Sequence, residues 1–242
     1  MRATNPFLQE GLAAAFGRRA FRRVYTLMVL FLAVMTVGIW PKNPIADFLR
    51  GGSPPQAFQA VSIALLLLIS YLGGRIGLEE YAREDFTAAA DLASLPSVPV
   101  RAVVSGKFLF AALHTVFLLC LGLPFLAVSV TVCGFRPSAL GRACLLIVPP
   151  ALVVRSAGIF LNLAFDLTPV PRNLALFAVM AALFAGTVVL APSWSPILLL
   201  ADPGGSSAGP LLYASFFHAL LVLCLIGASF AAMSFRRRRS GG

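Results

Sequence analysis

The stretch AFQAVSIALLLLISYLGGRI (residues 57–76) decides the fold class, because it holds only one charged residue, Arg75. A helix needs about 20 mainly apolar residues to cross a bilayer. Within lipid, a helix satisfies its backbone polar groups without water. The stretch also lacks the apolar–polar alternation of a membrane β-barrel strand. It therefore predicts a membrane-spanning α-helix.

Five further stretches have the same character. The whole chain is 59% hydrophobic and only 12% charged, whereas a soluble domain has about 45–50% apolar and about 25% charged residues. We therefore expect an all-α integral membrane protein with a single transmembrane domain over residues 1–242. Its six predicted spans are residues 24–40, 57–76, 108–132, 143–165, 174–191 and 211–235.

The positive charge is distributed unevenly among the connections. If the N-terminus is cytoplasmic, fourteen of the 19 lysine and arginine residues lie on the cytoplasmic side, four lie outside, and Arg155 falls within a span. Cytoplasmic flanks of spans are enriched in lysine and arginine. We expect a multi-pass protein of the bacterial inner (plasma) membrane with both ends cytoplasmic, and with Trp40 and Trp194 near the outer interface.

The net charge of +10 bears on the class of partner. Such a charge is also found in nucleic-acid-binding domains. Here the basic clusters abut long apolar runs, a pattern typical of membrane flanks that contact anionic lipid. Membrane lipids, and not nucleic acid, are the expected partner. The clusters are Arg18, Arg19, Arg22 and Arg23 before the first span and Arg236–Arg239 after the last.

Residues 5–23 predict an amphipathic helix on the inner membrane surface. Asn5 can cap the helix, with Pro6 at its first position. Phenylalanines recur among the arginines of this segment, which favours an interfacial helix over a merely solvated basic flank. Its bulky or apolar members are Phe7, Leu8, Leu12, Ala15, Phe16 and Phe21.

The connection 77–107 is the longest on the cytoplasmic side and holds five of the nine acidic residues. Residues 79–95 read as a helix rich in alanine and acid. Pro96 and Pro99 interrupt it, and a short second helix from Val100 leads into the third span. A structured segment among short loops is a candidate docking surface. The outer connections, residues 41–56 and 192–210, are rich in proline, glycine and serine and are expected to be irregular.

Two cytoplasmic segments carry a family resemblance. NPFLQEGLAAAFGRRAFRRV (residues 5–24) resembles the N-terminal interfacial helix of the membrane subunit of ABC-2 type ABC transporters. EEYAREDFTAAADLASLPSVPVRAVVSGKF (residues 79–108) resembles that family's signature between spans two and three. The end of span four, SAGIFLNLAF (156–165), and WSPILLLADP (194–203) are also similar to the family. The matching signature residues are Glu84, Thr87, Pro96, Gly106 and Lys107.

The resemblance implies an exporter permease of the ABC-2 (type V exporter-like) fold that moves by alternating access. The chain has no G-x-x-x-x-G-K-[ST] loop, the motif that cradles nucleotide phosphates. The resemblance therefore implies ATP and Mg on a separate ABC ATPase subunit, and a second permease copy or homologue. The acidic segment would be the coupling helix that docks on the ATPase; the alternative is a solvated acidic helix. The implied docking residues are Glu79, Glu80, Arg83, Glu84, Asp85, Thr87 and Asp91.

Polar residues within the predicted spans form a second set of candidates. An arginine inside a span is costly and usually faces protein or a water-filled cavity. Arg155 and Asn162 lie seven residues apart and so share a helix face. Together with His114, they are candidates for a pathway or subunit interface; the alternative for Arg155 is snorkelling to the membrane interface or a packing role. His114 and His218 are each expected to form a hydrogen bond between helices. Gly73 and Gly77 form a weak helix-packing signal.

The remaining chemistry of the sequence is sparse. No cluster of His, Cys and carboxylate residues indicates a metal site, and no serine–histidine–aspartate set appears. Cys133 and Cys144 flank one short outer loop, and their proximity leaves a disulfide open. Two functions other than an exporter stay open as well. One is a membrane-embedded lipid-modifying enzyme, and the other is a non-transporting membrane scaffold with the same fold.

Overall fold

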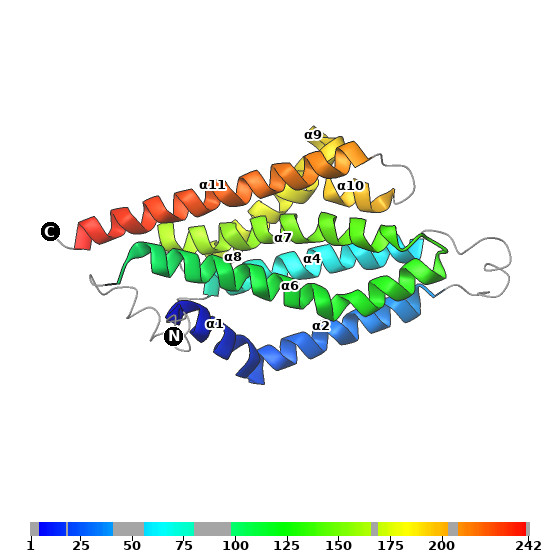
Figure 1. The fold of residues 1–242 in the computed structure, drawn as a ribbon, viewed down its shortest axis with the longest axis horizontal. Helices are drawn as coiled ribbons and strands as arrows, with labels where there is room; N and C mark the ends of the chain where they lie inside the picture. Colours follow the sequence, from blue (N-terminus) through cyan, green and yellow to red (C-terminus); the bar gives the residue numbers. More distant parts are fainter. Residues whose placement is uncertain are drawn as a thin grey trace.

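The computed structural model describes residues 5–17, 19–40, 56–79, 98–165, 169–202 and 208–240. The elements are α1 (Pro6–Gly17), α2 (Arg19–Gly38), α4 (Gln56–Glu79), α6 (Val100–Val132), α7 (Ser138–Ala164), α8 (Pro169–Ala181), the π-helix η2 (Ala182–Gly186), α9 (Thr187–Leu190), the 3-10 helix η3 (Pro192–Trp194), α10 (Pro196–Ala201) and α11 (Ala208–Ser240). The long helices α2, α4, α6, α7 and α11 run side by side along one long axis, and α1 crosses it obliquely (Figure 1).

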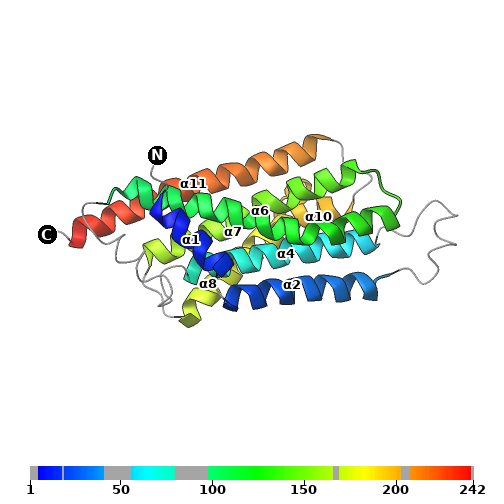
Figure 2. The same ribbon diagram turned by 60° about the horizontal axis from the view of Figure 1, so that its bottom comes forward.

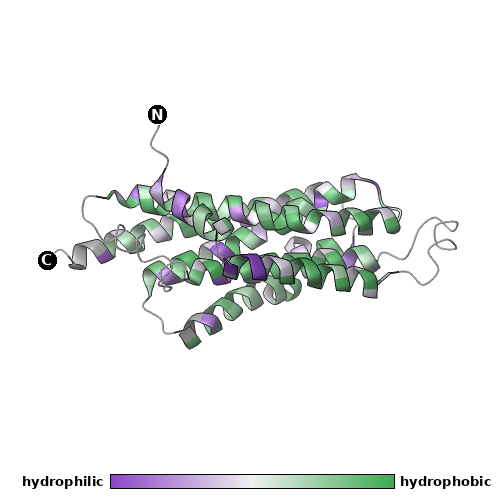
Figure 3. Ribbon diagram, turned by 90° about the horizontal axis from the view of Figure 1, so that it is seen from below, coloured by the Kyte–Doolittle hydropathy of each residue, from purple (hydrophilic) through white to green (hydrophobic). Residues whose placement is uncertain are grey.

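Six helices among the described residues are long and apolar enough to cross a bilayer, as expected of a multi-pass membrane protein. They are Phe21–Gly38, Gln56–Leu78, Val100–Val132, Ser138–Ala164, Asn173–Leu190 and Gly209–Arg236. Figure 3 shows apolar residues along most of the bundle. The spans follow the predicted ones closely. The fifth continues from α8 through η2 into α9, because the single π-turn adds a residue without ending the helix.

The start of α1 and the end of α11 lie at the same end of the bundle (Figure 1). We call this end the basic end, because the described arginines Arg19, Arg22, Arg23, Arg75, Arg101 and Arg236 lie there, on the first or last turns of their helices. Arg136 and Arg142 lie at the opposite end, as do Trp40 and Trp194, which expose 44% and 40% of their surface. The charge asymmetry expected of a membrane protein is therefore built into the bundle.

The centre of the bundle is the pair α4 and α7. In the most apolar stretch of each of these helices 61% of the residues are buried, against 17% in the spans formed by α2, by α8–α9 and by α11. A Cβ atom on Gly158 would lie 2.6 Å from the carbonyl oxygen of Gly74, and one on Gly77 would lie 2.8 Å from that of Arg155. Small residues let membrane helices approach closely. The predicted packing role of Gly77 is confirmed.

A proline on α7 frees a backbone carbonyl for the neighbouring helix. Pro149 lacks the N–H that would donate to Leu145, four residues earlier. The hydroxyl of Ser215 on α11 donates to that carbonyl oxygen over 3.3 Å. Prolines are tolerated in membrane helices where such a partner satisfies the freed group. This bond helps to fix α11 on α7.

Two details at the basic end differ from the prediction. In place of one helix over residues 5–23, the structure describes α1, which ends at Gly17, and α2, which begins at Arg19 and runs in another direction (Figure 1); Arg18 lies outside the described residues. Arg19, Arg22 and Arg23 therefore belong to a spanning helix. The expected short helix from Val100 is instead the first part of α6, which runs without interruption to Val132.

α1 lies across α6 (Figure 2), and Phe7, Gly11, Ala14 and Ala15 on one of its faces are buried. Asn5 accepts a hydrogen bond from the backbone N–H of Phe7 at 3.0 Å and donates from Nδ2 to the carbonyl oxygen of Ala102 on α6 at 2.7 Å. The same side chain thus caps α1 and ties it to α6. Gly11 lies against the ring of Phe110, so close that a Cβ atom would meet the ring at 2.7 Å.

The connection after α9 is not irregular throughout, in contrast to the prediction. Pro196 occupies the first turn of α10, a favourable place for proline, and a run of five apolar residues follows. Leu199 and Leu200 are buried, and the amide of Gln59 on α4 donates to the carbonyl of Ala201. The burial of this apolar face explains why the segment folds back against α4 and α7.

Candidate functional site

Arg155 and His114 form a buried hydrogen bond between two spans. Arg155 lies on α7 with none of its surface exposed, and His114 on α6 exposes 1%. The Nη1 atom of Arg155 lies 2.6 Å from Nδ1 of His114. The prediction that His114 bonds another helix is confirmed. Arg155 is enclosed by protein, so the snorkelling alternative is wrong.

The second ring nitrogen of His114 reaches a third span. Nε2 lies 2.8 Å from the hydroxyl of Tyr25 on α2, a side chain that is 8% exposed. A guanidinium can only donate, so Nδ1 of His114 accepts and the imidazole proton lies on Nε2. Nε2–H then donates to the Tyr25 oxygen. We call these three side chains the Arg155–His114–Tyr25 network.

Aromatic rings surround the network. The guanidinium carbon of Arg155 lies 4.8 Å from the centroid of the Phe110 ring, within cation–π range. Tyr25 meets Phe117 edge-on at 5.2 Å, and Phe117 in turn meets Phe16 of α1 at 4.8 Å. These contacts extend the network from α7 through α6 and α2 to α1.

Two glycines of α4 pack against Arg155. A Cβ atom on Gly73 would lie 3.6 Å from both Cβ and Cδ of Arg155, and Gly77 packs on its backbone. Ser70, one turn earlier on α4, is also buried. Arg155 therefore sits where α4, α6 and α7 meet, and a Cβ atom on Gly77, unlike one on Gly73, would clash with its backbone carbonyl.

The other predicted residues within spans lie outside this network. Asn162 faces the same side of α7 as Arg155 and is 8% exposed, but its position two turns further along keeps it apart. His218 donates from Nδ1 to the carbonyl oxygen of Ala214 in its own helix, at 2.5 Å. The predicted bond of His218 between helices is wrong. Lys107, read as part of a loop, is buried on α6.

The predicted docking residues lie almost entirely outside the described part of the chain. Glu79 is the last residue of α4. The positions of Glu80, Arg83, Glu84, Asp85, Thr87 and Asp91 fall in the range 80–97, which the structure does not describe. Their role stays a prediction from the sequence.

The cysteines are free thiols. Cys133 and Cys144 are not joined, and Cys120 and Cys224 face outward. Burial raises the pKa of the Cys133 thiol, which lies just beyond the end of α6. Among the described residues, no three His, Cys, Asp or Glu side chains gather as metal ligands would.

Sequence reasoning missed Tyr25 and Phe110. Tyr25 lies two residues after Arg23, at the end of the arginine-rich segment, where a tyrosine is typical of a membrane interface. Its helical spacing from Phe21 and Met28, all three buried, would have placed it on the inward face of α2. Phe110 lies one turn before His114, and this spacing was the available signal for a shared face.

The network can hold a buried positive charge, but it cannot relay protons through Arg155. Arginine keeps its proton in proteins, so Arg155 holds a fixed positive charge and cannot pass protons on. Such a charge in a span is costly and is held by polar partners from other helices.

Comparison of the chain with known protein families, with curated proteins and with solved structures finds no match.

Proposed function

We propose that this chain is the permease subunit of an ABC-2 type exporter. In this proposal the chain lines the translocation pathway, a second permease copy or homologue completes it, and a separate ABC ATPase binds ATP and Mg. The resemblance of residues 5–24 and 79–108 supports the family. The six-span bundle with both ends on one side is compatible with it.

One observation carries the proposal furthest: the proposed coupling segment joins the two helices that hold Arg155. Residues 80–97 connect the end of α4 to the start of α6. α4 supplies the glycines that pack on Arg155, and α6 supplies His114. A displacement of this segment by the ATPase would therefore be transmitted through α4 and through α6, the two helices that contact Arg155.

The Arg155–His114–Tyr25 network fits a helix interface that switches between two packing arrangements. Its hydrogen bonds are specific in direction, and they join α2, α6 and α7 at a single buried charge. Packed cores of this kind switch between discrete states and do not deform continuously. In the proposed mechanism, ATP binding by the partner moves the α4–α6 connection, and repacking around Arg155 opens the pathway to the other side.

The test uses the tagged full chain, purified with its associated proteins from membranes of the organism that encodes it. We expect ATP hydrolysis that vanadate inhibits, carried by a subunit with a P-loop. The charge-reversing E84K/D85K variant should lose this activity because docking charges set partner choice. The matched E84D/D85E variant, which keeps both charges, should retain it.

Two results would contradict the proposal. The first is the absence of any ATPase in preparations in which the chain itself is folded. The second is lipid turnover by the purified chain alone, which would identify a membrane-embedded enzyme. An unchanged ATPase activity in E84K/D85K would remove the coupling role of the acidic segment.

A further inference from the structure

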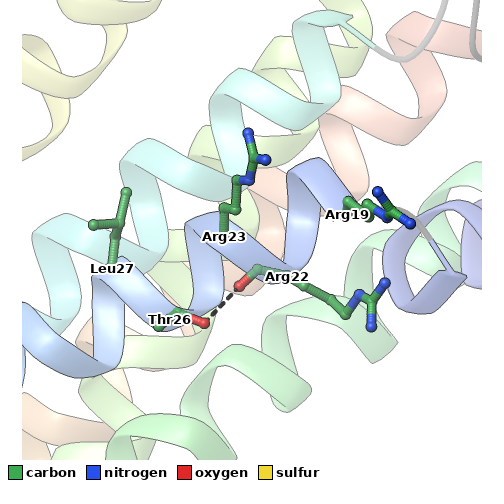
Figure 4. Close-up of a pocket in the computed structure, with 5 residues that line it drawn as sticks. All are labelled: Arg19, Arg22, Arg23, Thr26 and Leu27. Atoms are coloured by element: carbon green, nitrogen blue, oxygen red, sulfur yellow. Dashed lines mark hydrogen bonds between the residues drawn. The ribbon is translucent and has the colours of Figure 1, made fainter.

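Three arginines at the start of α2 line an open hollow. The hollow has a volume of about 510 Å³ and is lined by Arg19, Arg22, Arg23, Thr26 and Leu27. Figure 4 shows these five side chains on the first turns of α2. Their spacing of three and four residues places them on one face of the helix.

The guanidinium groups of this hollow have no partner among the residues that the structure describes. Within the described part of the chain, neither an ion pair nor a side-chain hydrogen bond occupies Arg19, Arg22 or Arg23. The Thr26 hydroxyl, in contrast, is taken up by the backbone carbonyl of Arg22 at 2.9 Å. Arginine offers a planar fork of donors that matches phosphate oxygens. The guanidinium donors of these three arginines therefore favour a phosphate group as ligand.

The same face of α2 continues as an apolar stripe. Leu27, Leu30, Val34 and Val37 are 63%, 57%, 63% and 74% exposed. From Leu27 to Val37 the helix rises roughly 15 Å, which is about half of a hydrocarbon core of about 30 Å. The stripe therefore has the length of one lipid leaflet and begins directly at the arginines.

We propose that Arg19, Arg22 and Arg23 bind the phosphate headgroup of an anionic phospholipid, whose acyl chains lie along the exposed stripe of α2. The charged head and the apolar stripe are joined in one surface, which fits a lipid better than a soluble phosphate. Juxtamembrane arginines are attracted to anionic lipid headgroups in this way. The site is independent of what the chain transports and of whether an ATPase binds it.

The test measures lipid retained by the purified full chain, with native mass spectrometry as the readout. The probes are phosphatidylglycerol and phosphatidylcholine with identical acyl chains. Wild type should retain phosphatidylglycerol in preference. The R19Q/R22Q/R23Q variant should bind it about fivefold more weakly for each arginine removed.

The matched control is R75Q/R101Q/R236Q. It removes the same charge from exposed arginines at the same end of the bundle, but away from the hollow. We expect it to retain phosphatidylglycerol nearly as wild type does. Equal loss in both variants would overturn the site, because it would mean that total charge alone attracts the lipid.

Two further arms separate the lipid from other occupants. Millimolar inorganic phosphate should not displace phosphatidylglycerol, and L30Q/V34Q should weaken its retention. If phosphate displaces phosphatidylglycerol and L30Q/V34Q retains it unchanged, the lipid proposal is overturned and the site binds a free anion. A dimer that buries this face and persists without lipid would overturn it in favour of a second copy.

A wild-type measurement covers the case in which R19Q/R22Q/R23Q does not fold. Phosphatidylglycerol should raise the thermal unfolding temperature of the wild-type chain above that in phosphatidylcholine, because a ligand of the folded state stabilises it. Low salt should enlarge this difference. Equal unfolding temperatures in the two lipids would overturn the proposal.

Discussion

The guanidinium of Arg155 donates to Nδ1 of His114 across 2.6 Å, and this bond joins α7 to α6 inside the bundle. Because Arg155 carries a permanent charge and His114 does not, truncating one of them should change the free energy of unfolding differently from truncating the other. Truncating His114 strands a buried charge, whereas truncating Arg155 leaves only a neutral acceptor.

We expect His114→Ala to lower the free energy of unfolding by about 2 kcal/mol, the range for hydrogen bonds to charged groups. Arg155→Met should cost less, since an apolar side chain of similar length avoids the desolvation of the charge. Thermal unfolding of the purified chain in one detergent measures both. His218→Ala, which removes a bond within α11 alone, is the control. A larger loss in Arg155→Met would contradict this account.

Tyr25→Phe tests the α2 side of the network. The change removes the oxygen that accepts from His114 Nε2 and leaves the ring in place. We expect a loss of about 1 kcal/mol, the usual net value of a hydrogen bond. Tyr213→Phe, at a side chain that is 66% exposed, should leave the unfolding temperature unchanged. Equal effects of the two substitutions would mean that the Tyr25 bond contributes nothing.

Gly158→Ala should separate the central helices. The new Cβ would lie 2.6 Å from a backbone carbonyl of α4, which no rotamer change can relieve. We expect a loss of about 2 kcal/mol. Gly141→Ala on the same helix meets nothing within 4 Å and should be neutral or stabilise by about 0.5 kcal/mol. Chemical denaturation in mixed micelles distinguishes the two, and stable Gly158→Ala protein would disprove the close contact.

Ser215 and Pro149 form a natural double-mutant cycle. Ser215→Ala should cost about 1 kcal/mol in the wild-type background, because the Leu145 carbonyl loses its partner. In a Pro149→Ala background, the restored backbone N–H can bond that carbonyl, so the same substitution should become neutral. Four unfolding curves decide the question. Additive effects of the two substitutions would show that Ser215 does not stabilise the chain through the Leu145 carbonyl.

Asn5→Asp separates the two roles of Asn5. Aspartate keeps the oxygen that caps α1 but cannot donate to the Ala102 carbonyl. We expect α1 to stay helical yet release from α6, so that limited proteolysis cuts near Gly17 several times faster than in wild type. Asn5→Ala, which removes both bonds, should cost about 1 kcal/mol more than Asn5→Asp. Identical digestion of Asn5→Asp and wild type would assign Asn5 to capping alone.

The spans were predictable because membrane crossing depends on apolar length, which is a local property of sequence. The change of direction between α1 and α2 and the fold-back of α10 were not predicted, because the buried faces of α1 and α10 pack on helices that are distant in the sequence. Arg155 and His114 were recognised as unusual within their spans. Their pairing with Tyr25 was not, because the bonds join residues 41 and 89 positions apart. Helical periodicity indicates the inward face of a span but not which span it meets.

The contact between α4 and α7 has a consequence for biosynthesis. These two helices are the most deeply buried, yet α6 separates them in the chain. While the protein emerges from the ribosome, α4 enters the membrane without the neighbour that covers its glycines. At about 5–20 residues per second, α7 follows α4 roughly ten seconds later. During that interval the nascent chain exposes the helix surface most able to pair with a wrong partner, which makes this the stage at which a membrane chaperone or insertase would matter most.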